Sequence, residues 1–247
     1  MAKLYFRYGA MGCGKTMQLL QVAFNYEERG MKVCVIKPAT DTKNGDKLLT
    51  RIGPERETDF CFSKETNLYD KIRANYTDVQ CILVDEAQFL TKEQVDDLMR
   101  ITIDFNIPVM AYGLRLNFRR EDGGFEGATR LLQIAHDIEE LKTICDCGRK
   151  ATYNARFLDG KLVADGPDVL IDDGTLKIAY RAICPACYEK YLAEGSAYVN
   201  SEKTGVKLRK KAIKTLNKFL KSSKKGQKCT LSLKVKMGPA SQHKHAK

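Results

Sequence analysis

The chain has 247 residues, with 42 lysine and arginine side chains against 31 aspartate and glutamate side chains, a formal net charge of +11. This charge is uneven, because residues 1–200 hold 27 basic and 30 acidic side chains, whereas residues 201–247 hold 15 basic side chains and one acidic side chain. The first 200 residues are slightly acidic. The net charge of the whole chain therefore says nothing about the function of residues 1–200. It does not indicate that these residues bind nucleic acid or a membrane.

Composition predicts a soluble, globular protein, with 43% hydrophobic and 30% charged residues. No apolar stretch reaches the roughly 18 residues needed to span a bilayer. Residues 1–6 lead into a strand-like segment and do not resemble a signal peptide. We therefore expect a cytoplasmic location and nine cysteines that are reduced thiols or metal ligands.

Strand and helix patterns alternate along the first part of the chain. Strands are predicted at residues 4–8, 32–37, 79–84, 107–113 and 138–144, and helices at 15–29, 68–75, 91–105 and 127–135. Residues 40–59 are polar and aperiodic, which predicts a long functional loop. The alternation predicts an α/β domain with a mostly parallel sheet and helices on both faces. From Cys145 onward, short β-like pieces lie between paired cysteines.

The segment between the first predicted strand and helix fits the phosphate-loop pattern G-x-x-x-x-G-K-[ST]. It comprises Gly9, Ala10, Met11, Gly12, Cys13, Gly14, Lys15 and Thr16. Backbone N–H groups and the helix N-terminus attract phosphate, Lys15 adds a positive charge, and Thr16 offers a hydroxyl to Mg²⁺. An ordinary glycine-rich turn is the alternative, and the strand–loop–helix context favours phosphate binding.

Asp85 and Glu86 follow the most apolar predicted strand. Parallel strands direct their carboxyl ends toward the ligand crevice, where an aspartate commonly serves Mg²⁺ in phosphate-loop proteins. The neighbouring Glu86 is then a general base that accepts a proton from the phosphoryl acceptor, or it is simply a solvated residue after the strand. The residues alone leave open whether the phosphoryl acceptor is water or a substrate hydroxyl.

Two cysteine pairs bracket the β-like region, Cys145 with Cys147 and Cys184 with Cys187. Two close pairs separated by β structure are typical of a zinc ribbon, in which four thiolates close a tetrahedral structural site. The alternative is four free cysteines. The remaining cysteines are dispersed and predict no site.

In this order, the phosphate loop, the Asp-Glu strand end and the cysteine pairs resemble the phosphate-loop, zinc-containing (type II) thymidine kinases, in particular the bacterial branch. The likeness runs from about residue 2 to about residue 191 and includes the stretches 26–31, 50–53, 83–90, 112–119 and 141–151. The resemblance implies transfer of a phosphoryl group from ATP to the 5′-hydroxyl of thymidine, and of deoxyuridine, to give dTMP for DNA synthesis. It implies a kinase domain (1–142) and a zinc-ribbon subdomain with a lasso loop (143–195). Composition adds a third part beyond the resemblance, a basic tail (196–247) that we expect to be disordered or partly helical.

The resemblance also implies residue roles. Glu86 accepts the hydroxyl proton, Thr16 and Asp85 serve Mg²⁺, and the ATP site comprises the phosphate loop with Asp85, Glu86, Ala87 and Gln88. The thymine and sugar pocket is lined by Phe89, Leu114, Phe118 and Tyr180, although core packing is the alternative for the two phenylalanines. A structural Zn²⁺ anchors the lasso that closes over the nucleoside. A homotetramer inhibited by dTTP is expected.

Three positions depart from the family pattern. Residues 171–177 replace the usual Ile-Gly-Gly turn before the pocket tyrosine. Lys43 stands where an arginine is frequent, which keeps the charge but loses the two-pronged guanidinium. Asn154 occupies a pocket position that is often threonine.

The tail has apolar residues at helical spacing within the basic segment 207–225. A basic amphipathic helix would bind an anionic partner such as RNA, a membrane surface or a protein, and a solvated extension is the alternative. A second function, an ATP-gated nucleic-acid-binding protein, would use this tail and the zinc region. Residues 145–187 carry six basic and six acidic side chains, which disfavours that function.

Overall fold

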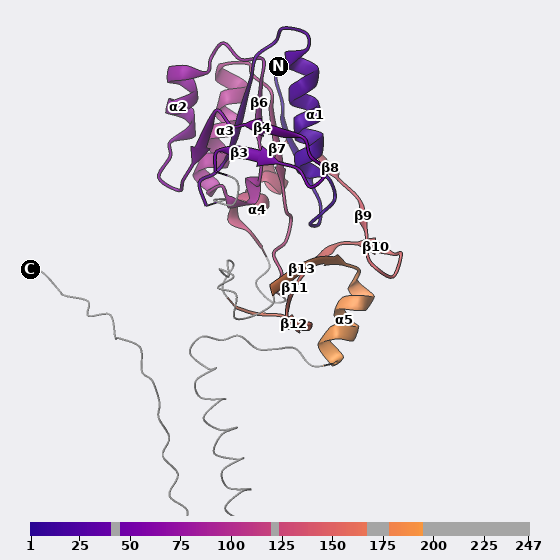
Figure 1. Cartoon of the computed structure of the whole chain (residues 1–247). Coiled ribbons are helices and arrows are strands. Elements are labelled where there is room, and N and C mark those ends of the chain that lie inside the picture. Colours follow the sequence, from indigo (N-terminus) through magenta and orange to yellow (C-terminus); the bar gives the residue numbers. More distant parts are fainter. Residues whose placement is uncertain (41–44, 120–123, 167–177, 195–247) are drawn as a thin grey trace, which may run out of the picture. The chain divides into compact units, whose positions relative to one another are not determined.

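The computed structural model describes residues 1–40, 45–119, 124–166 and 178–194 (Figure 1). The chain divides into two units, residues 1–200 and 201–247, and every described residue belongs to the first unit. The basic tail, Lys43 and the altered turn at 171–177 lie outside the described residues.

A six-stranded parallel sheet forms the centre of this unit. Its strands, in spatial order, are β5 (Phe60–Phe62), β2 (Val33–Pro38), β6 (Cys81–Val84), β7 (Val109–Gly113), β1 (Leu4–Tyr8) and β8 (Asp137–Glu140). Since all strands run in the same direction, their carboxyl ends meet at one edge of the sheet. The predicted mostly parallel sheet is confirmed.

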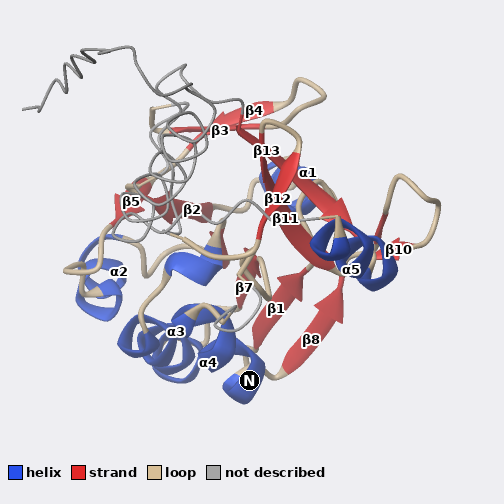
Figure 2. Ribbon diagram, turned by 90° about the horizontal axis from the view of Figure 1, so that it is seen from below, coloured by secondary structure: helices blue, strands red, loops and turns tan. Residues whose placement is uncertain are grey.

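Helices cover both faces of the sheet, as predicted. One face carries α1 (Lys15–Glu27), and the other carries α2 (Leu68–Asn75), α3 (Lys92–Asp104) and α4 (Glu126–Ile134) (Figure 2). Strand β6 serves both cores, because Cys81 and Leu83 pack with α1 while Ile82 and Val84 pack with the other three helices. This two-sided burial explains its uninterrupted apolar sequence. Within the described ranges, no helix combines the length and apolar character of a membrane span.

The predicted loop at 40–59 is wrong in part. It contains an antiparallel hairpin of β3 (Lys47–Leu49) and β4 (Glu55–Glu57), and Leu48 is buried in the core beneath α1. The predicted strand at 138–144 is two strands, β8 and the short β9 (Thr143–Ile144). Both errors concern strands of two to four residues, which are too short for a period-2 pattern to emerge.

A second, smaller β region follows β8. Strand β9 pairs with β10 (Lys150–Ala151), and β11 (Tyr153–Leu158) lies between β12 (Lys161–Val163) and β13 (Ile178–Ile183) in an antiparallel sheet. Helix α5 (Pro185–Ala193), which the sequence pattern did not indicate, begins with Pro185 directly after its N-cap Cys184. Proline is favoured in the first turn of a helix because its missing N–H is not needed there. The core of this region is separate from those of the parallel sheet.

The contact between α4 and the short helix η1 (Ala87–Phe89) generates a stability prediction. A Cβ atom at Gly127 would lie 2.5 Å from the Leu90 carbonyl oxygen and 2.9 Å from the Ala87 carbonyl oxygen. Replacing a helical glycine by alanine usually stabilises by about 1 kcal/mol, but here the backbone must move. We expect Gly127→Ala to lower the free energy of unfolding by about 1–3 kcal/mol, measured by urea denaturation.

Gly124 provides the control, because a Cβ atom there meets only the Thr129 hydroxyl, at 3.5 Å. Gly124→Ala is expected to leave the unfolding midpoint almost unchanged. Equal stability of the two alanine variants would contradict the close packing of α4 against η1.

Candidate active site and metal centre

The phosphate loop joins β1 to α1, in the position that the sequence predicts. Gly14 is the N-cap of α1 and supplies no side-chain hydrogen bond to the helix. The first N–H groups of α1 therefore point into the loop without a side-chain partner at the cap, which suits an anion. The Lys15 ammonium group is buried within the loop and donates to the carbonyl oxygens of Ala10 at 3.1 Å and Gly9 at 3.4 Å.

Asp85 lies at the carboxyl end of β6 and contacts the start of α1. Its Oδ2 accepts a hydrogen bond from the Thr16 hydroxyl at 2.9 Å, and its side chain is almost fully buried. The other oxygen, Oδ1, is buried and has no hydrogen-bond partner among the described residues. Burial, and then the neighbouring charge of Glu86, raise the pKa of Asp85 to about 7. A buried carboxylate oxygen beside a hydroxyl fits a small divalent cation, which would stabilise the ionised form.

Glu86 takes a different direction from its neighbour. Its backbone has φ +48°, in the left-handed region that glutamate rarely adopts, and it forms the N-cap of η1. Asp85 continues the β6 pattern toward α1, whereas the left-handed turn at Glu86 ends the strand. The two adjacent carboxylates are thus separated by the backbone conformation, and one can hold a cation while the other accepts a proton.

Ala87 and Gln88, both expected at the ATP site, are almost fully buried. The side-chain amide of Gln88 donates to Glu86 Oε2 and accepts from the Leu114 backbone N–H at 2.9 Å. Gln88 therefore connects the carboxylate pair to the end of β7. This connection has no signal in the sequence pattern, because the two segments are 26 residues apart.

The four residues expected at the nucleoside pocket form two groups. Phe89 packs edge-on against Phe125, with ring centroids 5.7 Å apart, and lies next to Gln88, which contacts Leu114. Phe118 is buried against strands β11 and β12, which supports a packing role for its ring. The guanidinium carbon of the fully buried Arg156 lies 3.6 Å from the Phe118 ring centroid.

Tyr180, the fourth of these residues, lies opposite Arg156 in the ladder between β11 and β13 and is 36% exposed. Arg156 is therefore a neighbour of two of the expected pocket residues. The sequence analysis missed it. Its only signal was a charged residue in the middle of an otherwise buried strand.

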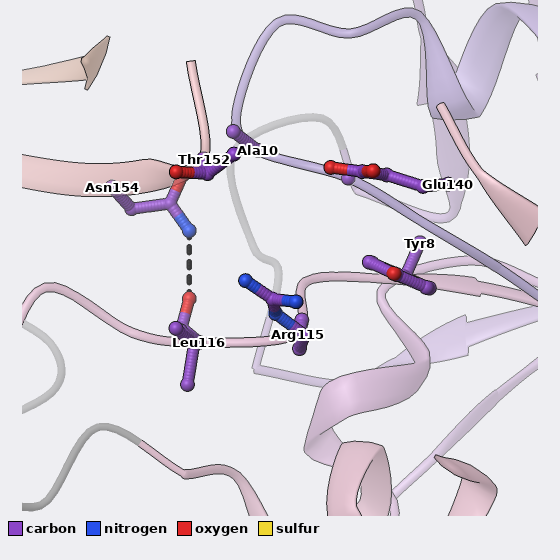
Figure 3. Close-up of a pocket in the computed structure, with 8 residues that line it drawn as sticks. Tyr8, Ala10, Arg115, Leu116, Glu140, Thr152 and Asn154 are labelled. Atoms are coloured by element: carbon purple, nitrogen blue, oxygen red, sulfur yellow. Dashed lines mark hydrogen bonds between the residues drawn. The ribbon is translucent and has the colours of Figure 1, made fainter. Parts of the chain in front are cut away.

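Asn154 connects three segments. Its Oδ1 accepts from the Met11 N–H at 2.8 Å, and its Nδ2 donates to the Leu116 carbonyl oxygen at 2.6 Å. Figure 3 shows it beside a small pocket that is also lined by Tyr8, Arg115 and Glu140. The amide presents its acceptor and its donor on separate atoms, and it bonds both backbone groups at the same time.

Arg51 is a further residue whose role the sequence left unassigned. It lies in the turn between β3 and β4, where the Thr50 hydroxyl donates to the Pro54 carbonyl oxygen at 2.9 Å. Its Nη1 lies 3.6 Å from the position that a Cβ atom on Gly12 would take. The hairpin missed in the sequence analysis thus places a guanidinium group beside the phosphate loop.

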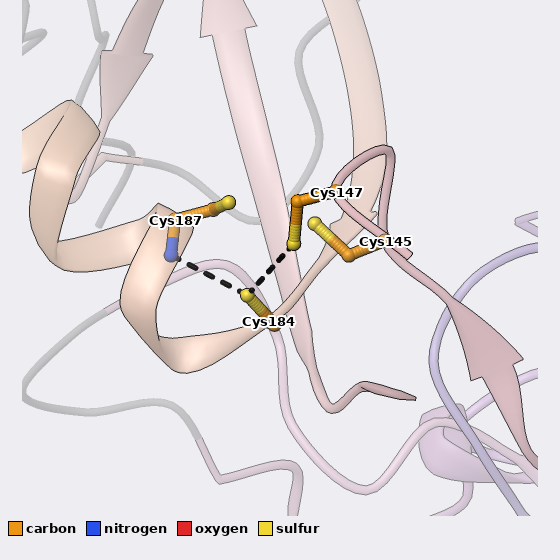
Figure 4. Close-up of side chains that lie close together, drawn as sticks. All are labelled: Cys145, Cys147, Cys184 and Cys187. Atoms are coloured by element: carbon orange, nitrogen blue, oxygen red, sulfur yellow. Dashed lines mark hydrogen bonds between the residues drawn. The ribbon is translucent and has the colours of Figure 1, made fainter. Parts of the chain in front are cut away.

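The four expected metal ligands meet in space. The sulfur atoms of Cys145, Cys147, Cys184 and Cys187 all lie within 4.8 Å of one another (Figure 4). Tetrahedral zinc with Zn–S bonds of about 2.3 Å requires S···S separations of about 3.8 Å, and the Cys147 and Cys184 sulfurs are 3.5 Å apart. One pair comes from the turn between β9 and β10, and the other from the N-terminus of α5.

The ionisation of the thiols also fits a cation. Hydrogen bonds from backbone N–H groups, first that of Cys147, lower the pKa of Cys145 to about 7, and the N–H of Cys187 lowers the pKa of Cys184. Hydrogen bonding with the neighbouring thiols, first Cys147, raises the pKa of Cys187 to about 12. Without a cation, the thiols of Cys145 and Cys184 lose their protons more readily, whereas Cys187 holds its proton. A central Zn²⁺ would let all four ionise.

Similar known proteins identify the family of this chain. The family model described as "Thymidine kinase" matches residues 2–188. The chain belongs to the thymidine kinase family. Thymidine kinases that it resembles include those of Francisella tularensis subsp. holarctica (42% identical over 191 residues, 74% of this chain and 95% of the relative) and Coxiella burnetii (47% over 175 residues, 68% and 87%). That of Chromobacterium violaceum is 44% identical over 190 residues, covering 76% of this chain and 98% of the relative.

The cysteine cluster predicts zinc-dependent stability. Cys147→Ser replaces one thiolate by a poor zinc ligand, and we expect the zinc content of the purified protein to fall from about one ion per chain to near zero. The melting temperature should fall with it. Zinc is measured by inductively coupled plasma mass spectrometry, and unfolding by scanning calorimetry.

Cys61→Ser is the matched control, because Cys61 is partly buried and lies outside the cluster. This variant should keep its zinc. Zinc retained by Cys147→Ser at the wild-type level would contradict a four-thiolate site.

Proposed function

We propose that this chain transfers the γ-phosphoryl group of ATP to the 5′-hydroxyl of thymidine, and also of deoxyuridine, forming the nucleoside monophosphate. The observation that carries this proposal is the hydrogen bond of Thr16 to Asp85, which brings the phosphate loop to the strand end from which Glu86 emerges. A phosphate loop beside two carboxylates also suits an ATPase. Membership of the thymidine kinase family favours a nucleoside acceptor over water.

On the ATP side, the backbone N–H groups at the start of α1 bind the phosphates. Lys15 exchanges its bonds to the loop carbonyls for bonds to phosphate oxygens, while Ala87 and Gln88 border the site. Thr16 and Asp85 would hold Mg²⁺, and the buried, unpartnered Asp85 oxygen fits that role. When bound, Mg²⁺ neutralises the charge that develops on the phosphoryl oxygens.

On the acceptor side, Glu86 takes the proton of the 5′-hydroxyl as the oxygen attacks phosphorus. Phe89, Leu114 and Tyr180 line the thymine and sugar pocket, and Phe118, whose ring packs against β11 and β12, completes its wall. The remaining task is to exclude water, which competes with the nucleoside as acceptor. We assign this task to the lasso held by the zinc subdomain, although residues 167–177 lie outside the described part of the chain.

The organisation of the chain follows from these roles. We propose a kinase domain at 1–142, a zinc-ribbon subdomain at 143–195 and a basic tail at 196–247. The separate apolar core of the zinc region supports the first boundary. The zinc ion is structural, because four thiolates fill a tetrahedral site and leave no position for substrate.

Family membership is the basis for three further parts of the proposal. The protein assembles as a homotetramer, is inhibited by dTTP and acts in the cytoplasm. The described cysteines form no disulfides, which suits a reducing compartment.

The tail binds an anionic partner through its excess of lysine.

The proposal is tested by Glu86→Gln, which keeps the shape of the side chain but removes its basicity. General-base catalysis contributes about 10²–10⁴-fold, so kcat should fall by that order while ATP binding is retained. Thymidine-dependent ADP release is measured by a coupled assay. Glu93→Gln, at an exposed acid of α3, serves as the control and should retain activity.

Deletion of residues 201–247 tests the proposed organisation. The family match ends at residue 188, so the truncated protein should phosphorylate thymidine with kcat and KM within about twofold of the full chain. Initial rates and size-exclusion chromatography check activity and assembly together. Loss of activity in a folded truncation would place the tail in the catalytic unit.

A further inference from the structure

The side chain of Gln88 makes two directed hydrogen bonds in a nearly closed space. It is 2% exposed and lies in η1, immediately after the carboxylate pair. Its Oε1 accepts from the Leu114 backbone N–H at 2.9 Å, and its Nε2 donates to Glu86 Oε2. The orientation of the amide is determined, because a backbone N–H only donates and so requires the amide oxygen. The NH₂ group must then face Glu86.

The neighbouring backbone keeps this arrangement tight. A Cβ atom at Gly113 would lie 2.9 Å from Gln88 Oε1 and 3.0 Å from the Gln88 backbone nitrogen. The end of β7 therefore approaches η1 closely only because residue 113 has no side chain. This approach brings the Leu114 N–H within reach of the amide and leaves the amide little freedom to move.

The hydrogen bond from Gln88 restricts the orientation of the Glu86 carboxylate. Its left-handed backbone, φ +48°, carries a half-buried side chain that can rotate about three bonds. The Gln88 Nε2 group donates to one oxygen of the Glu86 carboxylate. A carboxylate accepts hydrogen bonds at both oxygens, so the second oxygen remains suited to receive a proton from a hydroxyl. A catalytic base that is aligned before the substrate arrives loses less entropy in the reaction.

We propose that Gln88 is a positioning residue that aligns the Glu86 carboxylate with the acceptor hydroxyl, and that the Leu114 N–H fixes the direction of Gln88. This inference rests on the proposed role of Glu86 as base. It gives Gln88 a task other than direct contact with the ATP whose site it borders, and other than simple packing. The three roles predict different kinetic effects.

Two substitutions test the alignment. Gln88→Met keeps the side-chain volume and removes both hydrogen bonds. Gln88→Glu can still accept from the Leu114 N–H but cannot donate to Glu86 when ionised. We expect each to lower kcat about 10- to 100-fold, while the KM values for thymidine and ATP change by less than about threefold. A raised KM or Kd for ATP at unchanged kcat would overturn the proposal in favour of nucleotide binding.

Gln94→Met is the matched control. Gln94 is also almost fully buried. Its Oε1 accepts from the Thr91 N–H before α3, and its Nε2 donates to the carbonyl oxygens of Ser63 and Thr66, which lie between β5 and α2. Its replacement should lower the melting temperature to a similar degree and leave kcat within about twofold of wild type. If both methionine variants lose kcat in proportion to their stability, Gln88 has a packing role and the proposal fails.

A double-mutant cycle separates positioning from any independent effect. Glu86→Asp retains a carboxylate but withdraws it by one methylene group from Gln88. If Gln88 acts through Glu86, Gln88→Met should lower the remaining rate of Glu86→Asp by less than about twofold, with phosphorylation of radiolabelled thymidine as the assay. Additive losses would overturn the proposal.

The proposed function fails separately from this inference. It fails if the wild-type chain makes no thymidine monophosphate, or if Glu86→Gln is as active as wild type. The positioning role alone fails if Glu86→Gln is inactive and Gln88→Met and Gln88→Glu are fully active.

Discussion

The hydrogen bond between the Thr16 hydroxyl and Asp85 Oδ2 joins residues that are 69 positions apart in the chain. It exists because β1 and β6 run in the same direction, with β7 between them, so that the phosphate loop after one strand meets the acid after another. The loop and the carboxylate pair each require a strand end, and a parallel sheet places both at one edge. The meeting of the phosphate loop with the carboxylate pair therefore depends on strand direction before it depends on any side chain.

The end of strand β6 directs Asp85 and Glu86 into different surroundings. The residues of β6 alternate between the cores on either side of the sheet, which carries Asp85 toward α1. The left-handed residue that follows ends this alternation, and Glu86 leaves the strand on a different course. Adjacent acids in water repel each other and share one environment. Here Asp85 is buried with a raised pKa, whereas Glu86 is half-buried and accepts a hydrogen bond from an amide, so two consecutive acids have different chemical environments.

Sequence reasoning located the features that are local or repeat a known spacing. The phosphate-loop motif lies between β1 and α1, Asp85 lies at a strand end and the two cysteine pairs meet, as the sequence patterns predict, because each motif is contained within a few residues. Sequence reasoning missed α5, which begins at Pro185, and the β3–β4 hairpin, which buries Leu48 against a distant helix, because both are short and have no repeating pattern. It also missed the bonds that Gln88 and Asn154 make with distant backbone groups, since no periodicity or motif records which segments become neighbours after folding.

The Asn154 side chain joins the phosphate loop to the segment after β7 by bonding backbone atoms of both. Its amide bonds the N–H of Met11 and the carbonyl of Leu116, and neither group depends on the side chain that its residue carries. Substitutions at positions 11 and 116 can therefore change the side chains on either side of this link while both hydrogen bonds remain available. A substitution at position 154 removes both hydrogen bonds at once, so two segments far apart in the sequence depend on one amide.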